Sequence, residues 1–408
     1  MNVKILSMQR VVNYGSFMQA YALKKVVETA GHTVAFCDFN AGAARHLGVK
    51  VKKVTIWHKI FNLRKLLFKP NSYLAYRHFR QQLCQCYTQH AWPALGITAE
   101  KNLDYSGDLM IIGSDEVFNY TQNHAFGYVP ALFGLGVTTS SIISYAASAG
   151  YANASDVESD GMQDEMIKGF AQFDAIGVRD QNTFELASRY AKQAVHYTID
   201  PTLLVDFSQE TPDAHIPPNY LLVYAYGGRI DAAIDVKKIT EYAKSKNLRV
   251  ISVGFYNDWC DENMVVKPFD LLAVFKHASY VITDTFHGTI FSIKYCKPFV
   301  SIIQGENKWG SNASKVGFLL KQLNLSPRII NNSDNLASDL ETPIDYVAVN
   351  HTLAILRDQS LQFLHGALHK AEIKAQAFNV SNLAERLKDQ DLIQYSEQHL
   401  KQASVKKS

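Results

Sequence analysis

His287 is the residue of this chain whose surroundings most suggest chemistry. It lies in residues 280–292 (YVITDTFHGTIFS), where a short β-branched run is followed by small polar residues and then by a helical apolar pattern. This pattern predicts a strand, a tight turn and a helix. In an open α/β sheet such a turn binds ligands, because the helix that follows offers unpaired N–H groups to an anion. We therefore take His287, Asp284, Thr285 and Gly288 as candidate binding residues; a helix-entry histidine bonded only to backbone is the alternative.

Arg179 is a candidate cation at a second predicted strand end. It follows the apolar residues 175–178 and leads through Asp180 into a predicted helix over 182–191. The planar guanidinium of arginine holds a carboxylate or phosphate through two parallel hydrogen bonds. A surface or capping pair between Arg179 and Asp180 explains the motif equally well when it is taken alone.

Small and acidic residues end two further predicted strands. Ser114 and Asp115 follow the predicted strand 108–112, and Gly113 lets the backbone approach a ligand closely. Asp200 precedes Pro201, which restricts it to an extended conformation at a strand end. These side chains are expected at the same edge of the sheet.

The first turn of the chain offers a fourth group of candidates. Asn13, Gly15 and Ser16 separate a predicted strand over residues 3–6 from a helical pattern that begins at Phe17. The turn lacks GxGxxG, so a dinucleotide site is not indicated. A ligand-facing role and a simple helix N-cap are about equally good explanations.

Composition limits the class of protein. The 408 residues are 47% hydrophobic and 19% charged with a net charge of +3, which predicts a globular protein of two domains without attraction to nucleic acid. The five cysteines form no CxxC pair, so zinc and disulfides are not expected. No apolar run approaches the ~18 residues of a membrane span, and the first residues lack the centre of a signal peptide. A cytoplasmic protein is expected.

Alternating strands and helices predict the fold class. We expect α/β architecture with two Rossmann-like domains that face each other across a cleft, residues 1–205 and 220–345. The polar, proline-containing residues 206–219 are the predicted linker. Residues 346–408 are expected to form a long C-terminal helix and a basic tail.

Residues 50–69 interrupt this alternation with lysines between large apolar side chains. Such a basic amphipathic segment can lie on an anionic membrane surface. An ordinary helix with a buried apolar face and solvated lysines is the alternative, and it is the commoner case.

Seven motifs in order resemble the polysaccharide pyruvyl transferase family over most of residues 1–330. They are NYGSFMQAYAL, IIGSDEVFN, SYAASAG, IGVRD, DPTLL, YVITDTFHGTIFSIKYCKPFVSI and NASKVGFLLKQLNL. The resemblance implies a GT-B-like fold. It also implies transfer of a pyruvyl group from phosphoenolpyruvate to sugar hydroxyls, which forms a pyruvate ketal on a surface polysaccharide, such as a capsule or exopolysaccharide, or on its lipid-linked precursor.

The implied chemistry assigns roles to the candidate residues. The donor carries a carboxylate and a phosphate, for which Arg179, Lys315 and the helix N-terminus after His287 are the candidate ligands. His287 is a candidate proton donor or phosphate ligand, and Asp115 or Asp200 a candidate base. The sequence has no DxD or histidine cluster that indicates a metal, and no cofactor besides the donor is expected.

Two positions depart from the family pattern. Thr285 stands where some members carry arginine, and Lys315 follows Ser314 where many have Ser-Arg. The first change removes a possible anion ligand, and the second keeps the charge without the bidentate fork.

Two other functions remain open at this stage. A nucleotide-sugar glycosyltransferase would use the same fold, although no nucleotide-binding pattern is evident. A non-catalytic glycan-binding or scaffold protein would be held at the inner face of the membrane through residues 50–69. The expected partners are phosphoenolpyruvate and a saccharide acceptor, with peripheral contact to anionic lipid as an option.

Overall fold

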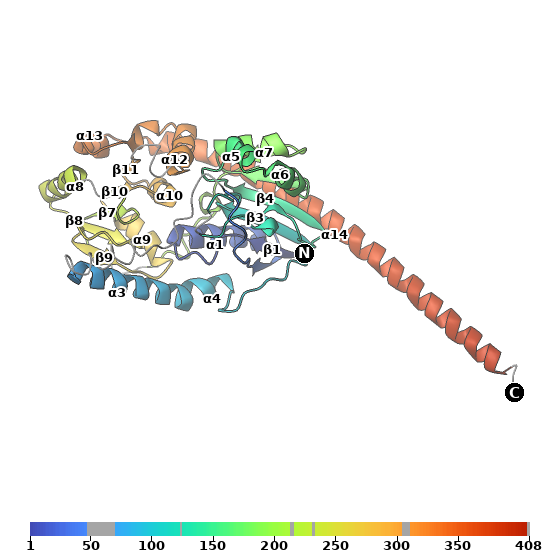
Figure 1. Cartoon of the computed structure of the whole chain (residues 1–408). Helices are drawn as coiled ribbons and strands as arrows, with labels where there is room; N and C mark the ends of the chain where they lie inside the picture. The colour runs from blue at the N-terminus through green and yellow to red at the C-terminus, as the bar shows by residue number, and fades with distance from the viewer. Residues whose placement is uncertain (47–69, 123–124, 213–215, 231–232, 304–310, 406–408) are drawn as a thin grey trace.

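Two parallel β-sheets covered by helices form the body of the protein in a computed structural model (Figure 1). The structure describes residues 1–46, 70–122, 125–212, 216–230, 233–303 and 311–405; the side chains at 70–71, 233–234, 311–314 and 379–405 are left aside. The amphipathic segment 50–69 lies outside the described residues. None of the described helices has the length and apolar character that a membrane span requires.

The first sheet is built from the N-terminal half of the chain. Its strand order is β2-β1-β3-β4-β5-β6, and all neighbours are parallel. The strands are β1 (Asn2–Leu6), β2 (Thr33–Cys37), β3 (Leu109–Asp115), β4 (Ser141–Ala147), β5 (Ala175–Val178) and β6 (Val195–Tyr197). Parallel strands joined by helices put all their carboxyl ends at one edge.

The second sheet repeats this design with later segments. Its order is β12-β11-β10-β7-β8-β9, again with parallel neighbours. The strands are β7 (Tyr220–Tyr224), β8 (Arg249–Val253), β9 (Glu262–Met264), β10 (Tyr280–Thr283), β11 (Phe299–Ile302) and β12 (Ile329–Ile330). The predicted α/β class with two Rossmann-like, GT-B-like halves is confirmed, whereas the exact domain boundaries stay a prediction.

Helices cover both faces of the sheets. The α-helices are α1 (Tyr14–Thr29), α3 (Pro70–Cys86), α4 (Trp92–Leu95), α5 (Ala154–Ser159), α6 (Gln163–Phe170), α7 (Gln181–Tyr190), α8 (Ala233–Ser245), α9 (Asp270–His277), α10 (Phe286–Lys294), α12 (Ser311–Gln322), α13 (Leu336–Glu341) and α14 (Tyr346–Val405). Short turns of other helix types are η1 (Tyr87–Ala91), η2 (Pro130–Phe133), η3 (Pro201–Leu203) and η4 (Ser326–Arg328).

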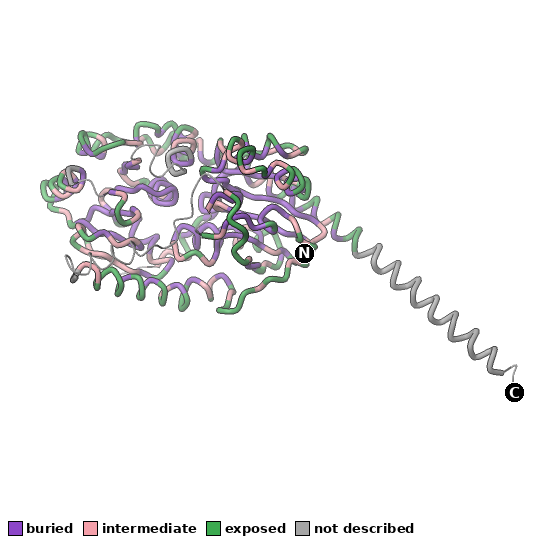
Figure 2. The backbone as a smooth tube through the Cα atoms, viewed as in Figure 1, coloured by how far each residue is buried: buried purple, intermediate pink, exposed green. Residues whose placement is uncertain are grey.

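One buried apolar cluster continues from the first half of the chain into the second. It joins Phe17 of α1 to Leu222 of β7 and Phe275 of α9, and the buried backbone in Figure 2 follows both sheets. Tyr14 links the halves directly, because its hydroxyl donates to Val266 O at 2.6 Å and accepts from Val266 N at 3.1 Å. The two sheets therefore share a packed interface beside the cleft.

The C-terminal helix α14 returns to the first sheet. Phe363 lies 5.2 Å from the His196 ring and 6.4 Å from the Tyr145 ring, measured between centroids. Ser360 Oγ accepts a hydrogen bond from Ile199 N at 3.0 Å. The predicted long helix is confirmed: α14 extends to Val405 and away from the body of the molecule (Figure 1).

Candidate functional site

The turn between β10 and α10 places His287 at a helix N-terminus, as the sequence predicts. Thr285 is the N-cap of α10, and its hydroxyl accepts from Gly288 N at 2.9 Å. A Cβ atom at Gly288 would lie 2.1 Å from Thr283 Oγ1, so a larger residue would not fit without movement. Thr285 and Gly288 therefore shape the turn, and His287 is the second residue of the helix.

The N-terminus of α1 faces His287 from the first half of the chain. Asn13 caps α1 by accepting from Gly15 N at 2.8 Å, and its Nδ2 donates to the Tyr226 hydroxyl at 3.0 Å. A Cβ atom at Gly15 would lie 2.3 Å from His287 Nδ1. The absence of a side chain at Gly15 thus lets the imidazole approach α1.

Arg179 lies between two carboxylates. Its Nη2 donates to Asp115 Oδ1 at 3.0 Å and its Nη1 donates to Asp200 Oδ2 at 2.7 Å, while its guanidinium stacks 4.6 Å from the Phe286 ring. The Arg179 side chain is 1% exposed. Ser16 Oγ donates to Asp115 Oδ2 at 2.8 Å. Burial by itself would raise the pKa of Asp115, but the charges of Arg179, His287 and Lys315 and the Ser16 hydrogen bond together outweigh burial, and the pKa is lowered.

Asp200 also connects Arg179 to His287. Its Oδ2 lies 3.4 Å from His287 Nε2, and its Oδ1 accepts from Thr202 N at 3.0 Å. Burial opposes ionisation, yet His287 and Arg179 together hold the pKa of Asp200 well below its usual range. The carboxylate of Asp200 is therefore ionised, and it lies beside the imidazole of His287.

Two buried nitrogen atoms in this cluster have no hydrogen-bond partner among the described residues. They are Arg179 Nε and His287 Nε2, since 3.4 Å is long for a hydrogen bond to Asp200. Buried polar atoms without partners are rare and costly. Arg179 and His287 both line one small cavity, so their unpaired nitrogen atoms mark a place where a ligand can supply acceptors.

A salt bridge joins the two halves across the same cavity. Lys315 of α12, whose side chain is 3% exposed, donates to Glu116 Oε1. Glu116 Oε2 also accepts from Asn119 Nδ2 at 2.8 Å and from Gln122 Nε2 at 2.7 Å. Burial alone would raise the pKa of Glu116, but the charge and hydrogen bond of Lys315, with the Asn119 hydrogen bond, lower it by more. The group is therefore a carboxylate. The side chain of Ser314, a predicted ligand, lies outside the described residues.

Two predicted binding residues lie behind the cavity wall. Asp284 accepts from Tyr226 N at 3.0 Å and from Arg229 Nη1 at 3.2 Å. Burial raises the pKa of Asp284 to about 6 despite the opposing charge of Arg229. Ser114 is fully buried and donates to Gln19 in the core of the first half. The structure thus does not bring Ser114 to the cleft. Asp284 does not line the cavity either, but it accepts a hydrogen bond from Tyr226, which does.

The cavity has a volume of about 60 Å³, which holds a few water molecules. Its lining residues are Asn13, Ser16, Asp115, Glu116, Arg179, Tyr224, Tyr226, Thr285, Phe286, His287 and Lys315. Sequence reasoning did not single out Glu116, Tyr224, Tyr226 or Phe286. Glu116 and Phe286 stand inside recognised motifs, so a signal was present for these two residues.

Comparison with known proteins gives a family and a general fold likeness. The family model described as "Polysaccharide pyruvyl transferase" matches residues 13–305. No curated protein matches the chain.

Solved structures similar to the chain include an S. aureus MnaA–UDP co-structure, with 10% identity, TM-score 0.44 and coverage of 86% of this chain and 90% of that one. A UDP-N-acetylglucosamine 2-epimerase from Rickettsia bellii is 8% identical with a TM-score of 0.45, and the match covers 90% of this chain and 96% of that one. Arabidopsis thaliana UGT89C1 complexed with quercetin is 10% identical with a TM-score of 0.46, and the match covers 91% of this chain and 99% of that one. Likeness of this degree says nothing about the activity of the chain.

Proposed function

Because the chain belongs to the polysaccharide pyruvyl transferase family, we propose that it transfers the pyruvyl group of phosphoenolpyruvate to two hydroxyl groups of a saccharide. The observation that carries this proposal is the pair of unsatisfied nitrogen atoms, Arg179 Nε and His287 Nε2, buried beside one cavity. Phosphoenolpyruvate offers a carboxylate and a phosphate as acceptors for them.

Donor binding requires an exchange of partners in the cleft. Arg179 is paired with Asp115, and Lys315 is paired with Glu116. The cavity of about 60 Å³ is also too small for the donor. The Lys315–Glu116 bridge joins the two halves, so we propose that it opens when the halves separate. Lys315 and the N-terminus of α10 then hold the phosphate, and Arg179 holds the carboxylate.

The reaction needs a proton at the methylene carbon of the donor. Protonated His287 gives this proton, which leaves an oxocarbenium-like centre at C2 that a sugar hydroxyl attacks. The attacking hydroxyl returns a proton to His287. A second hydroxyl then displaces phosphate from C2, and its proton leaves with the phosphate, so the products are the ketal and inorganic phosphate. A positioned acid of this kind contributes roughly 10²–10⁴-fold.

The two aspartates are assigned supporting roles in this proposal. Both bind Arg179, and the lowered pKa of each makes it a weak base. We propose that Asp200 orients His287 and stabilises its charge, and that Asp115 holds Arg179. The base role predicted for either residue stays a prediction, to be tested by the pH profile of Asp115→Asn.

The acceptor class is part of the same proposal. A surface polysaccharide or its lipid-linked precursor on the cytoplasmic side would bring the protein to the inner face of the membrane. Contact through residues 50–69 predicts retention on anionic liposomes at low salt that disappears when Lys52, Lys53, Lys59 and Lys65 are neutralised.

An acceptor screen tests the activity. Purified protein is incubated with phosphoenolpyruvate and saccharides that present vicinal or 1,3-related hydroxyls, and phosphate release and product mass are measured. We expect phosphate release that depends on the acceptor, a carboxyethylidene adduct on the sugar, and roughly 10²–10⁴-fold slower turnover for His287→Ala. The exposed His277 provides the control, because His277→Ala should keep full activity. Glycosyl transfer from a nucleotide sugar, or unchanged turnover by His287→Ala, would contradict the proposal.

A further inference from the structure

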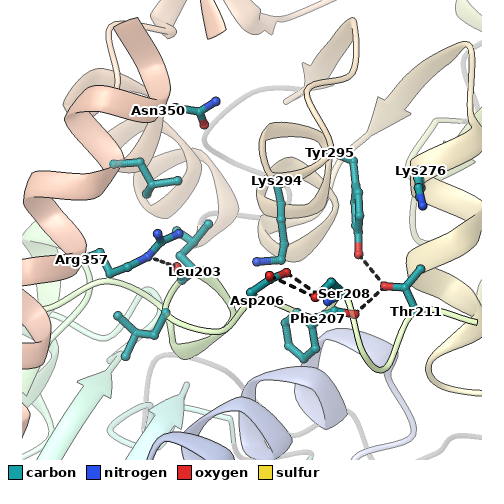
Figure 3. A pocket seen from close by; sticks show the side chains of 12 residues that line it. Leu203, Asp206, Phe207, Ser208, Thr211, Lys276, Lys294, Tyr295, Asn350 and Arg357 are labelled. Atoms are coloured by element: carbon teal, nitrogen blue, oxygen red, sulfur yellow. Dashed lines mark hydrogen bonds between the residues drawn. The ribbon is translucent and has the colours of Figure 1, made fainter. Parts of the chain in front are cut away.

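A second, larger pocket lies at the other end of α10. Lys294 ends this helix about 10 Å along its axis from His287, from a rise of ~1.5 Å per residue. The pocket has a volume of about 520 Å³, within the range of small-molecule sites. Figure 3 shows that its side chains come from the segment after η3, from α9 and α10, and from the start of α14.

Positive charge is in excess in this pocket. Lys276, Lys294 and Arg357 line it together with a single carboxylate, that of Asp206. Asp206 is already engaged, because its carboxylate accepts from Ser208 N at 3.0 Å and from Ser208 Oγ at 3.1 Å. Among the described residues, no salt bridge involves any of the three cations, which leaves their charge available to a ligand.

Lys294 and Arg357 are held in place by carbonyl groups. Lys294 Nζ donates to Val205 O at 2.5 Å and lies 5.1 Å from the Phe207 ring centroid. Arg357 Nε donates to Leu203 O at 3.0 Å, and this is its one hydrogen bond to the described residues. Its two Nη groups therefore remain as donors. Burial lowers the pKa of Lys294 to about 8, and the charge of Arg357 adds to this effect.

Neutral polar groups line the rest of the pocket. The Thr211 hydroxyl lies 3.3 Å from the Tyr295 hydroxyl, and the amide of Asn350 and the hydroxyl of Ser208 are also present (Figure 3). Hydroxyl and amide groups suit a ligand that carries hydroxyls of its own.

We propose that this pocket binds a small organic phosphate, with its phosphate between Lys294 and Arg357 and its hydroxyl-bearing part toward Thr211 and Tyr295. Such a ligand would contact both stretches of chain that run between the two halves, namely the segment after η3 and the start of α14. It is separate from the donor of the transfer reaction, and its binding does not depend on that reaction.

Calorimetric titration with glucose 6-phosphate, inorganic phosphate and sulfate tests the proposal. We expect one saturable site for glucose 6-phosphate, and roughly tenfold or more weaker binding in Lys294→Met and in Arg357→Gln, since each loses a charged hydrogen bond. Lys237, an exposed residue paired with Glu241, gives the control Lys237→Met, which should bind normally. The double variant Glu116→Gln/Lys315→Gln, altered only in the cleft, should also bind normally.

Several outcomes would overturn this site. Binding that survives both Lys294→Met and Arg357→Gln, or that is lost in the cleft double variant, would place the anion elsewhere. Equal affinity for inorganic phosphate and glucose 6-phosphate would rule out an organic ligand. A failure of pyruvyl transfer with this binding intact would concern the proposed function alone.

The pH dependence gives a second readout, with sulfate as the probe because its charge is constant near neutral pH. The ionisable groups that share the pocket with Lys294 are Asp206, Lys276, Tyr295 and Arg357. Burial raises the pKa of Tyr295, and the Ser208 hydrogen bonds lower that of Asp206. Above pH about 8 the affinity should fall up to about tenfold per pH unit, and Lys294→Arg should remove this dependence. The same decline in Lys294→Arg would contradict the proposal.

Discussion

The two ends of α10 face pockets that differ in how their charges are compensated. At the His287 end, Arg179 and Lys315 each contact a carboxylate, and the cavity is about 60 Å³. At the Lys294 end, three cations share about 520 Å³ with one carboxylate. The side chains that we propose for the transfer reaction therefore line the smaller of the two cavities.

This difference follows from burial. The Arg179 side chain is 1% exposed, and a charge so deeply buried is tolerated only when it is paired. Asp206 and Lys276 at the other pocket are exposed, so water screens the excess charge there. The cleft thus holds its cations paired with carboxylates, whereas the cations of the second pocket form no salt bridge with the described residues.

The largest expected effect is the difference in the free energy of unfolding between a variant in the cleft and a variant in the second pocket. Arg179→Ala leaves Asp115 and Asp200 buried without their partner, so the free energy of unfolding should fall by about 3–5 kcal/mol. Lys294→Met removes a partly buried ammonium that pairs with no described carboxylate, so the change should be about 1 kcal/mol or less. Urea unfolding of both variants measures the difference, and equal losses would show that the cleft charges are not the more tightly coupled set.

The pH dependence of stability distinguishes Asp284 behind the cleft from Asp206 at the second pocket. The pKa of Asp284 is raised from 3.8 to about 6 in the folded protein, so the folded state binds the proton more tightly. Ionisation of the Asp284 carboxyl group therefore lowers the free energy of unfolding as pH rises from about 4 to about 6, by about 3 kcal/mol in all. Asp206 has a lowered pKa and contributes in the opposite direction, with stability that is lost as pH falls below about 4.

Unfolding of wild type, Asp284→Asn and Asp206→Asn at several pH values measures these contributions. We expect the wild type to lose stability relative to Asp284→Asn between pH about 4 and about 7. A flat difference over this range would show that burial does not raise the pKa of Asp284.

The contact between α1 and His287 can be tested with glycine substitutions. A Cβ atom at Gly15 would lie 2.3 Å from His287 Nδ1, so Gly15→Ala should displace the imidazole and reduce turnover and stability, the latter by about 1–3 kcal/mol. Gly366 in α14 has nothing within 4 Å of its Cβ position, so Gly366→Ala should stabilise the helix by about 0.5–1 kcal/mol. Full turnover by Gly15→Ala would mean that the position of His287 is not critical.

The smallest effect concerns the bridge across the cleft. Glu116→Gln removes the carboxylate that competes for Lys315, so phosphoenolpyruvate should bind more tightly, by up to about tenfold. Glu210, which binds Lys25 away from the cleft, gives the control Glu210→Gln with unchanged affinity. Weaker binding of the donor by Glu116→Gln would indicate that Glu116 holds the site together rather than blocking it.

Sequence patterns predicted the features that depend on local order. Strand ends followed by small or polar residues placed His287, Arg179 and Asp115 at carboxyl edges, and parallel topology then brought these edges together. The same reasoning does not tell neighbouring side chains apart: Asp115 lines the cleft, whereas Ser114 is buried and donates to Gln19, so its role as a ligand stays a prediction.

Features that depend on tertiary packing were not accessible to sequence reasoning. The Lys315–Glu116 bridge joins residues 199 positions apart, and no spacing rule relates them. The second pocket likewise combines side chains from several distant segments, α14 among them. Burial, which makes Asp284 a weak acid, is equally a property of the folded chain.

Titration of phosphoenolpyruvate into three proteins tests the central claim, that the paired cleft and not the larger pocket takes the donor. The proteins are the wild type, Glu116→Gln/Lys315→Gln and Lys294→Met, each checked for folding by circular dichroism. We expect donor binding at the cleft to be roughly tenfold or more weaker in the double variant and unchanged in Lys294→Met. Loss of all donor binding in Lys294→Met, with full binding kept in the double variant, would contradict the claim.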